Sequence, residues 1–321
     1  MKRIIPPIDR ELLNAELTEE KFLRVTNFGG NKIYTVNYHN SPNVLREIGR
    51  LRELTFRNAG GGTGKEIDID EHDIAINPYQ QLIVWDPNRE DILGGYRYIF
   101  CPNAMKDDTG NYILATKRLF HFSDKFNKEY LPFTIELGRS FVQPNYQSST
   151  TSKKGVFALD NLWDGLGSLL INNPNVKYFF GKVTMYTDFN RRARDMILYF
   201  LNKQFNDKNN LISPIKPLQI ETDINELKNI FIHDDYMDDY KILLQNVRSL
   251  GENIPPLINS YMNLSPTMLV FGTSLNDHFG DVEETGIMVT ISDIYDNKKD
   301  RHLNMDRIKN AFKRIRIRKS G

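Results

Sequence analysis

A segment over residues 133–142 carries the side chains best suited to chemistry. Its sequence, predicted to form a strand, places Glu136 and Arg139 among apolar neighbours. A charged side chain in apolar surroundings needs a partner or a function, because burying it unpaired is costly. A partly buried carboxylate with a raised pKa suits a general base, whereas a tight pair with Arg139 would favour a structural role.

The spacing of these charges predicts an irregular strand. Regular alternation would put Glu136 with Gly138 on one face and Arg139 with Phe141 on the other. A bulge at Gly138 would bring both charges to one side and leave backbone N–H groups for a ligand. The alternative is a structural ion pair at a sheet edge.

A second group of charged residues is the acidic segment from Asp68 to Asp73. It does not match a calcium loop, because His72 and Asp73 stand where a short polar residue and a glycine belong, and Tyr79 stands where the bidentate glutamate belongs. Two interpretations are open for this segment. It forms a site for a cationic amine, or it is a solvated acidic turn.

The segment from Ala59 to Glu66 nearly matches a phosphate-binding loop. Ala59 replaces the first glycine, and Glu66 replaces the Ser or Thr that holds magnesium. Both departures argue against nucleotide binding. We expect a mobile loop over residues 58–65.

These residues must be positioned by strands and helices that the apolar pattern predicts. The expected helices cover 44–55, 159–170 and 193–201, and the expected strands cover 82–85, 92–100, 133–142, 176–186, 268–271 and 286–291. The segment from 206 to about 263 is helical and polar in character. The pattern predicts an α/β fold with a mixed sheet flanked by helices and a helical insertion.

Composition limits the class of protein. The 321 residues are 40% apolar, which supports a packed core, and 42 Lys+Arg against 41 Asp+Glu give no overall charge that would recruit nucleic acid. The lone Cys101 excludes a disulfide framework and a thiolate metal cluster. No apolar run approaches the roughly 20 residues that span a bilayer, so we expect a soluble or surface-bound protein.

Several short motifs, in order along the chain, resemble those of one family. They lie between Leu45 and Phe205 and again near residue 254, and they are Arg52-x3-Phe56, Asp70-x2-Asp73, Gly94-Gly-Tyr-Arg97, Glu136-Leu-Gly-Arg139, Phe141-Val-x-Pro144-x-Tyr146 and Ile254-Pro-Pro-Leu-Ile-x-x-Tyr261. This order resembles the GNAT-fold acyltransferases that use acyl carrier protein. Two relatives within that group are the acyl-homoserine-lactone synthases and the ornithine or glycine N-acyltransferases, a branch often labelled as hemolysins.

The resemblance implies an acyl-CoA N-acyltransferase fold. A phosphopantetheine arm would lie between two splayed strands, here 133–142 and 176–186. We expect residues 1–43 to be an N-terminal extension, 44–205 the GNAT-like core, and 206–321 a helical insertion, closing strands and a basic tail. One departure concerns the usual phosphate loop, which is replaced after Gln147 by a stretch ending in Lys153-Lys154-Gly155.

The resemblance also implies roles for particular residues. The expected catalytic residues are Glu136, Arg139 and Arg97, with Glu136 as the base. The expected acceptor site is formed by Asp70, Asp73 and Arg52. The expected donor site is formed by Phe141, Val142, Lys153, Lys154 and Gly155, with the oxyanion met by backbone N–H groups near Phe141 and Val142.

The predicted function is transfer of a long fatty acyl or 3-hydroxyacyl chain to the amine of an amino acid such as glycine or ornithine, giving an N-acyl amino acid lipid. We expect an acyl carrier protein, or CoA, as donor, with no tightly bound cofactor, no metal and no nucleic-acid partner. The alternatives are an autoinducer synthase of the acyl-homoserine-lactone type and a non-catalytic GNAT-fold binding module. The expected location is the cytoplasm, where the basic residues of segment 307–319 could contact the inner membrane surface or the carrier protein.

Overall fold

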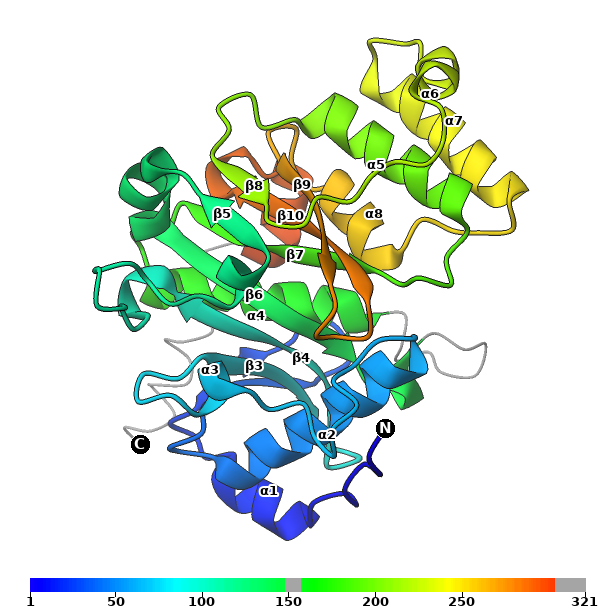
Figure 1. Cartoon of the computed structure of the whole chain (residues 1–321). Helices are drawn as coiled ribbons and strands as arrows, with labels where there is room; N and C mark the ends of the chain where they lie inside the picture. The colour runs from blue at the N-terminus through cyan, green and yellow to red at the C-terminus, as the bar shows by residue number, and fades with distance from the viewer. Residues whose placement is uncertain (148–156, 304–321) are drawn as a thin grey trace. The chain divides into compact units, whose positions relative to one another are not determined.

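The computed structural model describes residues 1–147 and 157–303, and it groups them into two compact units (Figure 1). Unit 1 contains the described residues of 1–115, 133–176 and 295–303. Unit 2 contains residues 116–132 and 177–294. These boundaries differ from the three segments expected from the sequence, since the segment before residue 44 contributes two strands to the sheet of unit 1.

Unit 1 is built on five antiparallel strands in the order β1-β2-β3-β4-β6. The strands are β1 (Phe22–Val25), β2 (Lys32–Val36), β3 (Gln80–Asp86), β4 (Asp91–Phe100) and β6 (Thr134–Val142). The helices are α1 (Arg10–Glu16), α2 (Pro42–Asn58), α3 (Glu71–Ile74), α4 (Ala158–Asn172) and α9 (Asp296–Lys298).

Helices α2 and α4 cover opposite faces of this sheet. A Cβ added to Gly165 of α4 would lie 2.6 Å from the side chain of Leu82 in β3. Arg52 of α2 donates to Gln81, the residue that precedes Leu82 in the same strand. Adjacent strand residues point to opposite faces, so α2 and α4 lie on opposite sides of the sheet. In Figure 1 the strands labelled β3 and β4 lie between these two helices. The apolar spacing of Val44, Leu45, Ile48 and Leu51 predicted α2 correctly.

A polar anchor holds α4 in place. The buried carboxylate of Asp164 accepts from the backbone N–H of Asn27 at 2.8 Å and from its side-chain amide at 2.7 Å. The Nδ1 of His302 lies 2.9 Å from the same carboxylate. The anchor therefore ties α4 to the β1–β2 connection and to the segment after α9.

Unit 2 contains three antiparallel strands in the order β7-β10-β9 and a two-stranded sheet of β5 and β8. The strands are β5 (Phe120–Phe122), β7 (Tyr178–Met185), β8 (Ile212–Pro214), β9 (Leu269–Asn276) and β10 (Val282–Thr290). The helices are α5 (Arg191–Phe205), α6 (Ile224–Ile230), α7 (Tyr236–Ser249) and α8 (Pro256–Met262). The α/β class is confirmed, and α6 to α8 form the expected helical segment.

The glycine-rich loop is not the freely moving connector that we expected from the sequence. The buried carboxylate of Glu53 accepts from the N–H of Thr63 at 3.0 Å, from its hydroxyl at 2.7 Å and from the N–H of Gly64 at 2.9 Å. The backbone N–H of Lys2 also donates to the carbonyl of Gly64 at 2.8 Å. These bonds fix the path of the chain into the acidic segment.

Candidate active site

Strand register places the charged residues of unit 1 on the face that α2 covers. Gln81 of β3 pairs with Arg97 of β4, and Arg97 pairs with Gly138 of β6. Glu136 lies two residues before Gly138 and therefore shares that face. The sheet alone thus aligns an amide, a guanidinium and a carboxylate across three strands.

A bulge interrupts β6 beside Gly138, as the sequence predicted. The pairing runs from Gly95 with Phe141 to Arg97 with Gly138, so β6 has one extra residue in this interval. The left-handed backbone conformation falls on Arg139, with φ 48°, rather than on the glycine. The bulge redirects the Arg139 side chain, which the regular alternation would have sent to the opposite face.

Two glycines of β4 allow close approach at this bulge. A Cβ at Gly94 would lie 2.4 Å from the carbonyl oxygen of Phe141, and one at Gly95 would lie 2.6 Å from that of Leu82. Any larger residue at either position would force the strands to shift. The Gly94-Gly95 pair is therefore a steric requirement of the irregular β4–β6 ladder.

The short helix α3 orients two carboxylates. Asp70 Oδ1 accepts from the backbone N–H of His72 at 3.0 Å and of Asp73 at 3.3 Å, while Asp73 Oδ2 accepts from the N–H of Asp70 at 3.1 Å. This reciprocal capping satisfies backbone N–H groups at the N-terminal end of α3 and so stabilises a helix of only four residues. The acidic segment is thus an ordered turn, one end of which faces Arg97.

Asp73 is the buried centre of the arrangement. It accepts from Arg52 Nη1 at 3.3 and 3.4 Å, from Gln81 Nε2 at 2.9 Å and from Arg97 Nη1 at 3.2 Å. Arg52 is fully buried and also donates to the Gln81 amide oxygen. Asp73 and Arg52 are thus engaged with other side chains of the site, and their role in acceptor binding stays a prediction.

Asp70 and Arg139 form the more exposed edge of this group. Their side chains are 19% and 14% exposed, against 4% for Arg97. Arg97 Nη1 donates to Asp70 Oδ1 at 2.7 Å, and Arg139 lies 2.8 Å from Asp68 and 3.7 Å from Asp70. We call the set of Arg52, Asp68, Asp70, Asp73, Gln81, Arg97 and Arg139 the Arg97 cluster.

The charges of the Arg97 cluster set its protonation. Burial alone would raise the pKa of Asp70, but the charge and hydrogen bond of Arg97 lower it below its ordinary value. Burial alone would lower the pKa of Arg97, but Asp73 and Asp70 raise it. Both groups are therefore ionised at neutral pH and present opposite charges to a ligand.

Glu136 lies beside the Arg97 cluster and is 1% exposed. The Tyr79 hydroxyl donates to Glu136 Oε2, and its oxygen accepts from the backbone N–H of Ala115 at 3.0 Å. The guanidinium of Arg97 lies over the Tyr79 ring, 5.1 Å from its centroid. Glu136 therefore contacts the Arg97 cluster through Tyr79.

The predicted donor residues are only partly described. Phe141 is buried and Val142 is half-buried, and both follow the bulge in β6. Lys153, Lys154 and Gly155 lie outside the described residues. The basic segment 307–319 also lies outside them.

This constellation suits attack of an amine on an activated carbonyl. It offers a carboxylate to accept a proton, an ionised aspartate to meet an ammonium group and a guanidinium to meet a carboxylate. Comparison with known proteins supports this chemistry. Residues 51–154 match the family model described as the acetyltransferase (GNAT) domain.

Two curated relatives match almost the whole chain. They are proteins named glycine N(alpha)-acyltransferase from Phocaeicola vulgatus and from Bacteroides thetaiotaomicron. Each is 59% identical over 303 residues, which cover 94% of this chain and 93% and 90% of the relatives. The chain belongs to the GNAT N-acyltransferase family. It is therefore an acyltransferase, and the non-catalytic alternative is set aside.

One solved structure is also similar to this N-acyltransferase. It is a CoA-dependent acyl-homoserine lactone synthase with SAM and isopentyl-CoA, 15% identical, with a TM-score of 0.31. The match covers 52% of this chain and 72% of that one. Among residues 1–147 and 157–303, no helix of the N-acyltransferase has the length and apolar character to cross a membrane.

Two residues near the predicted site of this N-acyltransferase, Tyr79 and Gln81, were missed as functional candidates. Gln81 donates to Asp73, and the ring of Tyr79 lies 5.3 Å from that of His72. Asp68 and His72 belong to the acidic segment that the sequence already offered as an amine site, and Asp68 pairs with Arg139 at 2.8 Å. The contacts of Tyr79 and Gln81 with this segment depend on the docking of α3, which apolar periodicity does not reveal.

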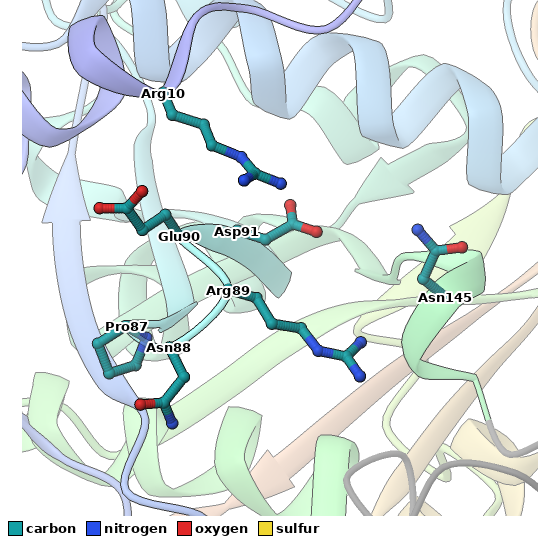
Figure 2. A pocket seen from close by; sticks show the side chains of 7 residues that line it. All are labelled: Arg10, Pro87, Asn88, Arg89, Glu90, Asp91 and Asn145. Carbon is teal, nitrogen blue, oxygen red and sulfur yellow. The ribbon is translucent and has the colours of Figure 1, made fainter.

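A separate polar hollow of about 640 Å³ lies elsewhere on unit 1 of this N-acyltransferase. Figure 2 shows the guanidinium of Arg10 directed toward Asp91 and that of Arg89 toward Asn145. Arg89 also lies 5.4 Å from the centroid of the Tyr146 ring. The hollow is lined by polar residues that carry both signs of charge, so it is unsuited to an acyl chain.

Proposed function

We propose that this N-acyltransferase transfers a fatty acyl chain from acyl carrier protein to the amine of glycine, giving an N-acylglycine lipid. The observation that carries the proposal is the 59% identity, along nearly the full length, to proteins named glycine N(alpha)-acyltransferase. The geometry of the Arg97 cluster supports a small zwitterionic acceptor.

In this proposal the acceptor binds at the exposed edge of the Arg97 cluster. The ammonium group of glycine meets Asp70, and its carboxylate meets Arg139. Arg97 was expected among the catalytic residues, and its Nη1 is engaged by Asp70 and Asp73. Arg97 therefore orients Asp70 and supplies positive charge nearby.

Glu136 acts as the general base, directly or through a water. It takes a proton from the glycine ammonium, and the freed amine attacks the thioester carbonyl. The tetrahedral oxyanion meets backbone N–H groups near Phe141 and Val142 and then collapses. The C–N bond forms, the C–S bond breaks, and the thiolate leaves and takes up a proton, so that each transfer releases one net proton.

The carrier protein is the proposed donor, with acyl-CoA as the alternative. Seven basic residues of segment 307–319 supply positive charge for an acidic carrier surface or an anionic membrane; they are Arg307, Lys309, Lys313, Arg314, Arg316, Arg318 and Lys319. A chain ending at Asp306 should keep activity toward a small thioester and lose binding to carrier protein. Loss of binding only to anionic liposomes would assign the tail to membranes instead.

A direct assay tests the whole proposal. The enzyme is incubated with palmitoyl carrier protein or palmitoyl-CoA and with ¹⁵N-glycine or ornithine, and products are identified by mass spectrometry. We expect N-palmitoylglycine carrying the label, with faster turnover from the carrier protein. Labelled product from ornithine alone would contradict the acceptor, and methylthioadenosine released from S-adenosylmethionine would favour the autoinducer alternative.

A further inference from the structure

Tyr79 occupies the point where the Arg97 cluster meets Glu136. It precedes β3, it is 3% exposed, and its backbone N–H donates to the carbonyl of His72 at 2.9 Å. Its ring packs under Arg97 and against His72, while its hydroxyl reaches Glu136. One side chain thus contacts α3, β4 and β6.

We propose that Tyr79 is a positioning residue that holds the carboxylate of Glu136 in one orientation for proton removal. This inference rests on the role of general base proposed above for Glu136. Tyr79 itself touches neither substrate in this scheme and acts through the carboxylate.

The hydrogen-bond directions support this assignment. A backbone N–H can only donate, so the phenol oxygen of Tyr79 accepts from Ala115 and its own proton is directed to Glu136 Oε2. A hydrogen bond donated to a carboxylate favours the ionised form and lowers its pKa. The bond also fixes the orientation of the carboxylate in its buried site.

Tyr79 remains a donor across the working range of pH. Burial, and then the charge and hydrogen bond of Glu136, raise the pKa of the phenol well above its ordinary value of 10.0. The phenol of Tyr79 therefore stays protonated at neutral pH. A hydroxyl of this kind stabilises the base without exchanging its own proton in the reaction.

The other titratable and charged groups around the pair of Tyr79 and Glu136 lie in α3, in β4 and in the turn that follows β4. Burial and the charge of Arg97 lower the pKa of His72 of α3, so this imidazole is neutral at pH 7. Burial and Glu136 raise the pKa of the Cys101 thiol at the end of β4, which is therefore also neutral. Arg97 keeps its charge throughout. Among these neighbours, His72 is the group whose titration must be considered when the pH profile of kcat/KM is interpreted.

The test is the pH dependence of kcat/KM for glycine in Tyr79→Phe. This substitution keeps the ring under Arg97 and removes the hydroxyl that donates to the carboxylate of Glu136. We expect the acidic limb to move to higher pH by on the order of one unit. The matched control is Tyr98→Phe, which removes another buried hydroxyl, bonded to Thr35 at 2.7 Å, and should leave the limb unchanged.

Failure of this inference is distinguishable from failure of the proposed function. If Glu136→Gln keeps full activity, the base assignment is wrong and the inference falls with it. If Glu136→Gln is inactive but Tyr79→Phe leaves the limb in place, only the inference is overturned. A limb that moves equally in Tyr79→Phe and Tyr98→Phe would also overturn it.

A second measurement keeps the test valid if Tyr79→Phe fails to fold. In protein with ¹³Cζ-labelled tyrosine, Glu136→Gln should move the titration of one resonance to lower pH, because the neighbouring negative charge is removed. Titration curves that are unchanged by Glu136→Gln would overturn the contact on which the inference depends.

Discussion

Two buried networks of charge, one in each unit, have different designs. In unit 2, Arg194 donates to Glu283 at 2.8 Å and pairs with its neighbour Asp195 at 2.6 Å, and Asp195 accepts from the backbone N–H groups of Glu221 and Thr222. We call these residues the Arg194 network. Its bonds join α5, β10 and the segment before α6, and they reach the backbone N–H groups before α6 and the exposed side chains of Arg191 and Glu221.

The Arg97 cluster of unit 1 ends on side chains at an exposed edge. Asp70 and Arg139 remain partly accessible, a left-handed residue redirects one guanidinium, and Glu136 with its tyrosine donor lies alongside. Burial and pairing are common to both networks. The comparison teaches that ion pairing alone does not distinguish the two networks, and that our proposal of a catalytic site in unit 1 rests on the geometry around the pairs. The following predictions test this difference.

The largest effect is expected from Glu136→Gln. The variant keeps the size of the side chain and loses the base, so kcat should fall by about 10²- to 10⁴-fold. Thermal unfolding followed by circular dichroism should show that the fold is kept. The matched control is Glu284→Gln, a buried carboxylate in unit 2 paired with Lys182, which should lower the midpoint of unfolding and leave the kcat of folded enzyme near that of the wild type.

Arg194→Leu should have the opposite effect to Glu136→Gln, namely a loss of stability with little change in kcat. Removing the guanidinium leaves the buried Glu283 with only Arg191 as a cationic partner and the buried Asp195 with none, which should cost up to about 3–5 kcal/mol of folding free energy. Urea unfolding measures the loss, while kcat per folded molecule should change little. Arg192→Leu on the same helix removes an exposed pair with Glu226 and should cost only about 0–1 kcal/mol. A large fall in kcat for folded Arg194→Leu would contradict the comparison.

Asp70→Asn should weaken acceptor binding with little change in fold. Asparagine caps a helix about as well as aspartate, so α3 keeps its first turn. The lost charge should raise KM for glycine by about 10- to 100-fold, consistent with a hydrogen bond to a charged group. Asp223→Asn makes the same change at the start of α6 and should leave KM unaltered. An equal rise in both variants would remove Asp70 from the acceptor site.

The smallest effect concerns acid stability. Because the folded-state pKa of Asp70 lies below its unfolded value of 3.8, the ionised group stabilises the fold above that value, and this stability is lost as pH falls toward the folded pKa. Wild-type protein should therefore lose stability more steeply between pH 5 and pH 3 than Asp70→Asn. Urea unfolding at several pH values measures both slopes, and parallel slopes would contradict the proposed pairing with Arg97.

Much of the fold followed from local pattern. The helix expected over 44–55 is α2, and the strands expected over 92–100 and 133–142 agree with β4 and β6 to within one residue at each end. The bulge beside Gly138 was also predictable, because a buried Glu and Arg flank a glycine. The left-handed conformation at Arg139 was not, because it depends on how Gly94 and Gly95 let the two strands approach.

The site was predicted less completely. The motifs named Arg52, Asp70, Asp73, Arg97 and Arg139, and the structure brings these five together, although their assigned roles stay predictions. Nothing in the motif separates the buried Asp73 from the more exposed Asp70, since both belong to one short stretch of sequence. The contact of Tyr79 with Glu136 spans 57 positions of sequence and depends on the packing of a four-residue helix, which leaves no periodic trace.

The loop closed by Glu53 has a consequence for assays in cell extracts. The backbone N–H groups of Thr63 and Gly64 in this loop already donate to the carboxylate of Glu53. Arg57 also donates to this carboxylate. ATP or GTP would have to displace this internal anion before it could occupy the loop. Millimolar nucleotide in an extract should therefore leave the rate of acylation unaffected, so turnover can be measured there without first removing the nucleotide pool.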